Sequence, residues 1–140
     1  MRRLFSALTA LLGAALALSP FELFPVCTAA AAGGGHMKCW YSGLFITAMG
    51  VVVIAAALCA WRGRLVAPAF AVAAAAALLC WLVPNGVVPI SGDGWRAGLC
   101  GDASHACNAV TMPAVGKLVA GTVIVGVLGL IAGFLRRDGR

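Results

Sequence analysis

Apolar residues occur along this chain in four long blocks, and short polar or glycine-rich stretches separate the blocks. Each block has roughly the 20 residues that an α-helix needs to cross the hydrocarbon core of a bilayer. The pattern predicts spans over residues 4–24, 41–61, 65–83 and 115–135. Because the core of a bilayer offers no water to backbone amides, each span is expected to be helical.

The four spans define the expected fold class, an all-α membrane protein. We expect one integral membrane domain over residues 1–140, a four-transmembrane-helix bundle with outer loops at 25–40 and 84–114. The composition, 63% hydrophobic and 10% charged, agrees with this class. Soluble domains are typically about 45–50% apolar and about 25% charged. The lipid bilayer is therefore the first expected partner, and a second membrane protein or another copy of the chain is a further candidate.

The basic residues are distributed unevenly between the two ends of the predicted bundle. They form no aromatic-rich basic patch, so the net charge of +6 does not indicate a nucleic-acid partner. Seven of them fall before the first span, between the second and third, or after the last: Arg2, Arg3, Arg62, Arg64, Arg136, Arg137 and Arg140. Because cytoplasmic loops carry the excess of Lys and Arg, we predict a multi-pass protein of the cell membrane with both termini in the cytoplasm.

The first span could also be part of a cleavable signal peptide. Arg2 and Arg3 precede its apolar residues, and the small residues 28–33 could host a cleavage site. We prefer an uncleaved span, because the apolar stretch continues to Phe24, past the usual 7–15-residue core of a signal peptide.

The two halves of the chain share one plan: a span, an outer loop with two cysteines, and a second span. In each loop a histidine shortly precedes the second cysteine. The residues are Cys27, His36 and Cys39 in the first loop and Cys100, His105 and Cys107 in the second. This plan is consistent with two parallel helix-hairpin repeats, a form of internal symmetry known in membrane proteins. We expect both histidine–cysteine pairs to lie together at the outer end of the bundle.

The six cysteines divide by location. Cys59 and Cys80 lie inside predicted spans, where a buried cysteine behaves as a small hydrophobic residue. The disulfide or thiol candidates are the four on the outer side, which is an oxidising compartment: Cys27, Cys39, Cys100 and Cys107. An even number of such cysteines favours disulfides, and four of them allow three connectivities, between which the sequence does not choose.

Several short motifs among the four spans resemble a known family. They are "SPFELFPVC" with Pro25 and Cys27, "HMKCWYS" with Met37, Lys38 and Cys39, "GLC" with Cys100, and "HACNAVTMPA" with Cys107, Thr111 and Pro113. In this pattern the chain is similar to domain-of-unknown-function family 4418. The resemblance implies a small four-span membrane protein of bacteria or archaea without an assigned activity. Members tend to have a histidine directly after the second cysteine of each pair, where this chain has Trp40 and Asn108.

The first functional hypothesis is a scaffold or accessory subunit whose extracytoplasmic loops are held by disulfides. It assigns no catalytic residue and no cofactor. The second is a metal site, with zinc or copper bound by His36, Cys39, His105 and Cys107.

The third hypothesis is a quinone-linked membrane thiol oxidoreductase. Four spans with two cysteines in each outer loop are similar to the membrane oxidases that make disulfides and to the vitamin K epoxide reductase family. Those enzymes use a C-x-x-C pair, which this chain lacks. The sequence therefore favours a protein that is not an enzyme.

Overall fold

Four helices account for most of the chain in the computed structural model, which describes residues 2–27, 35–63 and 65–138, with side chains to residue 134. The helices are α1 (Arg2–Leu18), α2 (Lys38–Trp61), α3 (Val66–Leu82) and α4 (Met112–Asp138). A π-helical turn, η1 (Ser19–Leu23), continues α1, and a second, η2 (Cys107–Thr111), leads into α4. The predicted all-α fold class is confirmed. The candidate cleavage region at 28–33, Arg64 and Arg140 lie outside the described residues.

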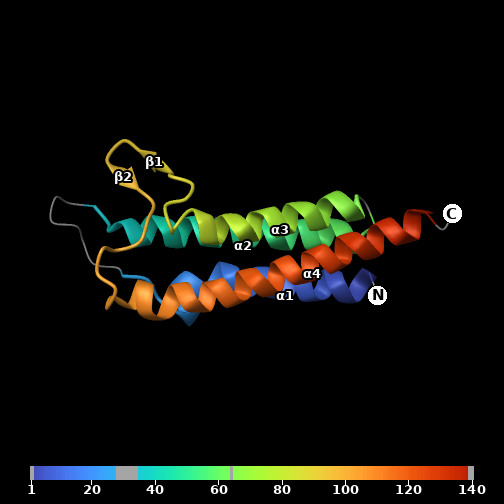
Figure 1. Cartoon of the computed structure of the whole chain (residues 1–140), viewed down its shortest axis with the longest axis horizontal. Coiled ribbons are helices and arrows are strands. Elements are labelled where there is room, and N and C mark those ends of the chain that lie inside the picture. The colour runs from blue at the N-terminus through green and yellow to red at the C-terminus, as the bar shows by residue number, and fades with distance from the viewer. Residues whose placement is uncertain (1, 28–34, 64, 139–140) are drawn as a thin grey trace.

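The helices pack in a ring, in which α1 contacts α2, α2 contacts α3, α3 contacts α4, and α4 contacts α1. Helices α2 and α4 therefore occupy opposite corners, as expected if the two halves are parallel repeats. The start of α1 and the end of α4 lie at one end of the bundle, where α2 ends and α3 begins (Figure 1). We call this the terminal end. The opposite end carries the two long loops, and we call it the cysteine end.

Three of the helical segments are long and apolar enough to cross a membrane: Arg2–Leu23, Lys38–Trp61 and Cys107–Phe134. Helix α3 is shorter, with 17 residues, at the lower limit of the about 17–25 residues that spanning helices use. It begins after Leu65, which has a φ of 50° and so adopts the left-handed conformation. The described residues thus contain three long apolar helical segments and one short apolar helix.

Small residues bring neighbouring helices close together. A Cβ atom added to Gly50 of α2 would lie 2.5 Å from the Ala17 backbone nitrogen in α1. Beside it, the Thr47 hydroxyl donates a hydrogen bond to the Ala17 carbonyl at 3.0 Å. In α4, a Cβ on Gly129 would lie 2.8 Å from the Phe70 ring of α3. Such close approach through small residues is how membrane helices gain packing energy.

The loop from α3 to α4 contains a short hairpin that the apolar pattern did not predict. Its strands, β1 (Ser91–Gly92) and β2 (Trp95–Arg96), pair antiparallel. The turn between them is Asp93–Gly94. Gly94 has a φ of 76°, whereas the φ of Asp93 is not positive, which is the pattern of a type II turn with glycine at its second central position. The Trp95 ring lies 5.3 Å from the Tyr41 ring, between centroids, so the hairpin rests against the start of α2.

Candidate functional site: a four-cysteine cluster

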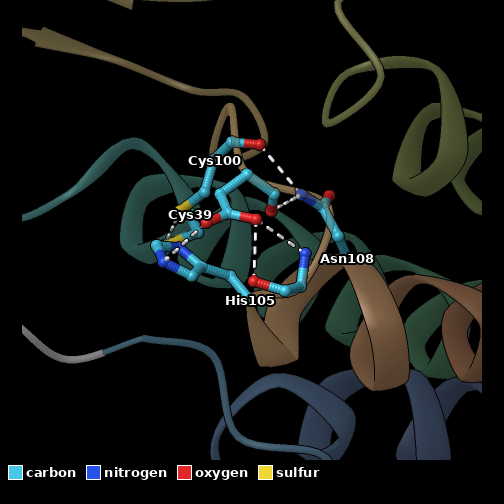
Figure 2. A network of polar contacts seen from close by, with 6 residues as sticks. Cys39, Cys100, His105 and Asn108 are labelled. Carbon is cyan, nitrogen blue, oxygen red and sulfur yellow. Dashed lines mark hydrogen bonds and ion pairs between the residues drawn. The ribbon is translucent and has the colours of Figure 1, made fainter.

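Four cysteine side chains meet at the cysteine end of the bundle. The Sγ atoms of Cys27, Cys39, Cys100 and Cys107 all lie within 4.8 Å of one another. The Cys100 and Cys39 sulfurs are 3.3 Å apart, with the Cys100 thiol as donor (Figure 2). Cys39 and Cys107 are buried, whereas Cys27 and Cys100 are partly exposed. We call these residues the four-cysteine cluster; it joins both outer loops to the starts of both even-numbered helices.

The two buried cysteines occupy the first turns of long helices. Cys39 is the second residue of α2, and Cys107 is the first residue of η2, which runs into α4. Neither helix start has a side-chain cap. The positive end of a helix dipole favours negative charge near such a position. Two helix N-termini therefore lie at the place where the sulfurs meet.

Hydrogen bonds from helix side chains hold the loop that carries Cys100. Ser42 donates its hydroxyl to the Gly98 carbonyl at 3.0 Å and accepts a hydrogen bond from the Gly98 N–H at 2.8 Å. The Asn108 amide donates to the Cys100 carbonyl at 2.9 Å and to the Asp102 carbonyl at 2.7 Å (Figure 2). These bonds fix the loop on both sides of Cys100. No role for Ser42 or Asn108 could be predicted from the sequence, because polar residues beside an apolar block occur for many reasons.

The loop that carries Cys27 is fixed in a similar way. The Thr111 hydroxyl, in the last position of η2, donates a hydrogen bond to the Phe24 carbonyl at 3.0 Å. At the end of η1, the Val26 N–H donates to the Pro20 carbonyl at 2.8 Å. The Cys39 thiol points to the Cys27 carbonyl at a distance of 3.8 Å. Each loop cysteine is thus tied through hydrogen bonds to a helix start that carries a buried cysteine.

The two histidines proposed from the sequence as metal ligands are not members of the four-cysteine cluster. The His36 ring stacks on the Trp40 ring, with centroids 4.6 Å apart. His105 is exposed, and its Nε2 lies 3.8 Å from a carboxylate oxygen of Asp102. The structure therefore brings Cys39 and Cys107 together with Cys27 and Cys100, in place of the mixed set of two cysteines and two histidines.

All six cysteines are free thiols in the described residues. The 3.3 Å contact between Cys39 and Cys100 is longer than the about 2.05 Å of a disulfide, so the expected disulfides are not formed in this structure. Cys80 is buried, as expected, in a core cluster with Leu16 and Ile46. Cys59 is exposed on the bundle surface, and the expectation of burial was wrong for this residue. The exposed surface of α2 is where lipid would contact it.

Two ionisable groups of the outer loop, the Cys100 thiol and the Asp102 carboxyl, have pKa values shifted in opposite directions. Burial raises the pKa of the Cys100 thiol, and hydrogen bonding to the Cys39 sulfur raises it further. Without a cation, the Cys100 thiol therefore favours its neutral form. Hydrogen bonds from the Ser104 N–H and hydroxyl lower the pKa of the Asp102 carboxyl, which stays ionised as the acceptor of a turn.

The fold and the site together define a class, namely small helical membrane proteins with a cluster of thiols at one end. The chain also belongs to a known protein family. The profile of the family "Domain of unknown function (DUF4418)" matches residues 9–135. The resemblance seen in the short cysteine motifs is therefore confirmed over nearly the whole chain. No curated protein and no solved structure matches it.

Proposed function

We propose that this protein is a membrane-embedded metal–thiolate protein, in which the four-cysteine cluster binds one zinc ion that fastens the cysteine end of the bundle. The observation that carries the proposal is that all four sulfurs lie within 4.8 Å of one another. Zinc bound tetrahedrally by four thiolates, with zinc–sulfur bonds of about 2.3 Å, places its sulfurs about 3.8 Å apart. Each distance between two sulfurs therefore needs to change by about 1 Å at most to reach this geometry.

A bound cation would also resolve the unfavourable electrostatics of the site. Four thiolates at this spacing repel one another, and a divalent cation reduces their net charge from −4 to −2. The two helix N-termini that point at the cluster favour the remaining negative charge. Sites with four protein ligands and no open position are typically structural, whereas catalytic zinc sites keep a position for water or substrate. The proposed role is thus structural, in agreement with a scaffold or accessory subunit.

The contact between Cys39 and Cys100 supports a second candidate, a dithiol redox centre. The two thiols would form one disulfide and pass two electrons and two protons to a quinone, which becomes a quinol. The 3.3 Å separation of the sulfurs is compatible with that step. The absence of a C-x-x-C pair from the sequence and the gathering of four sulfurs instead of two favour the metal site.

Elemental analysis combined with thiol alkylation distinguishes these functions. We expect the protein purified in detergent to contain about one zinc ion per chain. The four cluster thiols should resist alkylation until a chelator removes the metal, after which all four should react. A protein without metal, whose mass is lower by the hydrogens of two disulfides, would replace the metal site by a disulfide-held scaffold. A single disulfide that forms on addition of a quinone would support the redox centre.

We further propose that the terminal end of the bundle faces the cytoplasm. In the sequence, seven of the ten basic residues come at the start of α1, between α2 and α3, or after the apolar part of α4, and three lie elsewhere. By the positive-inside rule, an alkaline phosphatase fused after Arg140 should be inactive, and a fluorescent protein at the same place should fluoresce. The matched control is the phosphatase fused after Ser91 in the hairpin loop, which should be active. Activity of the phosphatase after Arg140 would reverse the orientation and place the four-cysteine cluster in the cytoplasm.

A further inference from the structure

A lysine lies on the outside of α4 at a depth where hydrocarbon is expected. The helical segment Cys107–Phe134 is longer than the about 20 residues that cross the hydrocarbon core. If the hydrocarbon core ends at Phe134, about 20 residues counted back from there place its beginning near Val115. If it ends earlier, it also begins earlier, so Lys117 lies within the core in either case. The Lys117 side chain is exposed on the bundle surface. A charge that faces lipid at this depth is costly, and such residues usually mark a binding site or have an anionic partner.

The described part of the chain gives Lys117 no such partner. The one close contact between oppositely ionisable side chains in the described residues is that of His105 with Asp102, in the loop between α3 and α4. The flexible lysine stem can follow the apolar surface and carry its ammonium group toward the headgroups. The position of Lys117 therefore favours an anionic partner outside the protein, at the depth of the lipid headgroups.

A groove on the bundle surface begins beside this lysine. It has a volume of 650 Å³ and lies between α3 and α4. Gly116 lets the Trp81 ring lie directly on α4, because any Cβ there would be 2.7 Å from a ring carbon. The residues of α4 that line the groove extend from Pro113 to Ile124, a rise of about 16 Å along the helix. Apart from Lys117, the groove is lined by apolar side chains and glycine.

We propose that this groove binds one anionic glycerophospholipid, with its phosphate at the Lys117 ammonium and an acyl chain along the α3–α4 groove. The direction agrees with the bilayer, because Lys117 and Trp81 lie toward the cysteine end and the groove continues to Ile124 toward the middle of the span. Tryptophan beside the charge is typical of the level at which headgroups meet acyl chains. The groove has a positive charge at the Lys117 end and apolar side chains along the rest of its length, which favours a phospholipid over a free anion. The proposal does not depend on the metal site.

Native mass spectrometry with added lipid tests the site. We expect phosphatidylglycerol to bind the detergent-solubilised protein about fivefold more tightly than phosphatidylcholine, the gain that one lysine near an anionic headgroup typically gives. The Lys117→Gln variant should lose this preference, and Lys117→Arg should retain it. The Ala120→Phe variant, which fills the groove, should weaken the binding of both lipids. Arg96→Gln removes a basic residue from the loop between α3 and α4 and is the matched control, with the preference unchanged.

Two results would overturn the proposal. One is an equal preference for phosphatidylglycerol in the native protein and in Lys117→Gln. The other is a Lys117→Gln variant that dissociates an oligomer or a co-purified membrane protein while lipid binding stays the same, since the partner of Lys117 is then an acidic residue on another helix. The zinc content of each variant, measured in parallel, shows that the cysteine end is intact and separates this test from the test of the metal site.

Discussion

Replacing Cys39 with serine is expected to release the metal ion and to lower the thermal unfolding midpoint of the detergent-solubilised protein by on the order of 10 °C. Cys39 is buried at the start of α2 and lies within 4.8 Å of the three other cluster sulfurs. The free energy of binding a structural zinc ion is coupled directly to folding, so the loss of a ligand destabilises the fold. The measurement is thermal unfolding followed by circular dichroism, with zinc content determined on the same sample.

The matched control for this substitution is Cys59→Ser in the same helix. Cys59 is exposed and far from the four-cysteine cluster in sequence, so its replacement should leave the zinc content and the unfolding midpoint nearly unchanged. Addition of a chelator to the native protein should reproduce the effect of Cys39→Ser and should have little further effect on that variant. A Cys39→Ser protein that keeps its full zinc content and native midpoint would contradict the proposed centre.

Replacing Gly50 with alanine should be among the most destabilising single changes in the membrane-embedded part of the bundle, by about 2–3 kcal/mol. The new Cβ would lie 2.5 Å from the Ala17 nitrogen and 2.7 Å from the Ala17 Cα, which are backbone atoms and cannot rotate away. Helices α1 and α2 would have to separate, which would also stretch the 3.0 Å hydrogen bond from Thr47 to the Ala17 carbonyl. The expected readout is a thermal midpoint lower by roughly 5–10 °C.

Gly121→Ala in α4 is the matched control, because it makes the same chemical change in a helix. A Cβ at Gly121 would be 3.7 Å from the Leu12 side chain, an ordinary contact distance. Alanine has the higher helix propensity, so this variant should be neutral or more stable by up to about 1 kcal/mol. Equal midpoints for Gly50→Ala and Gly121→Ala would show that α1 and α2 do not pack as closely as described.

The hydrophobic pattern predicted the four helices because each must present apolar side chains over most of its length. The boundaries are less well encoded. Helix α2 begins at Lys38, before the predicted block that starts at residue 41, because polar residues remain helical near the surface of a bundle. The hairpin was not predicted because strands of two residues each are too short to show an alternating pattern. The one sequence signal for it was the turn pair Asp93–Gly94.

The four cysteines of the candidate site could be predicted from the sequence, but the position of the two histidines outside the cluster could not. The division of the cysteines between outer loops and spans selects the four residues that the structure gathers. The spacing of each histidine from a cysteine suggested a mixed ligand set, yet His36 stacks on Trp40 and His105 faces Asp102. These contacts depend on side-chain packing in the loops, and neither spacing nor composition encodes such packing. The roles of Ser42 and Asn108 depend on loop geometry in the same way.

The short length of α3 has a consequence for the surrounding membrane. Its 17 residues rise about 25 Å, whereas the hydrocarbon core of a typical bilayer is about 30 Å thick. The neighbouring helices α2 and α4 are long enough to cover the full thickness, with 24 and 27 residues. The hydrophobic mismatch is therefore confined to one side of the protein, where the lipids must compress at a cost of fractions of a kcal/mol per ångström. Bilayers of short-chain lipids match this side best, so lipid chain length should control where such a protein accumulates.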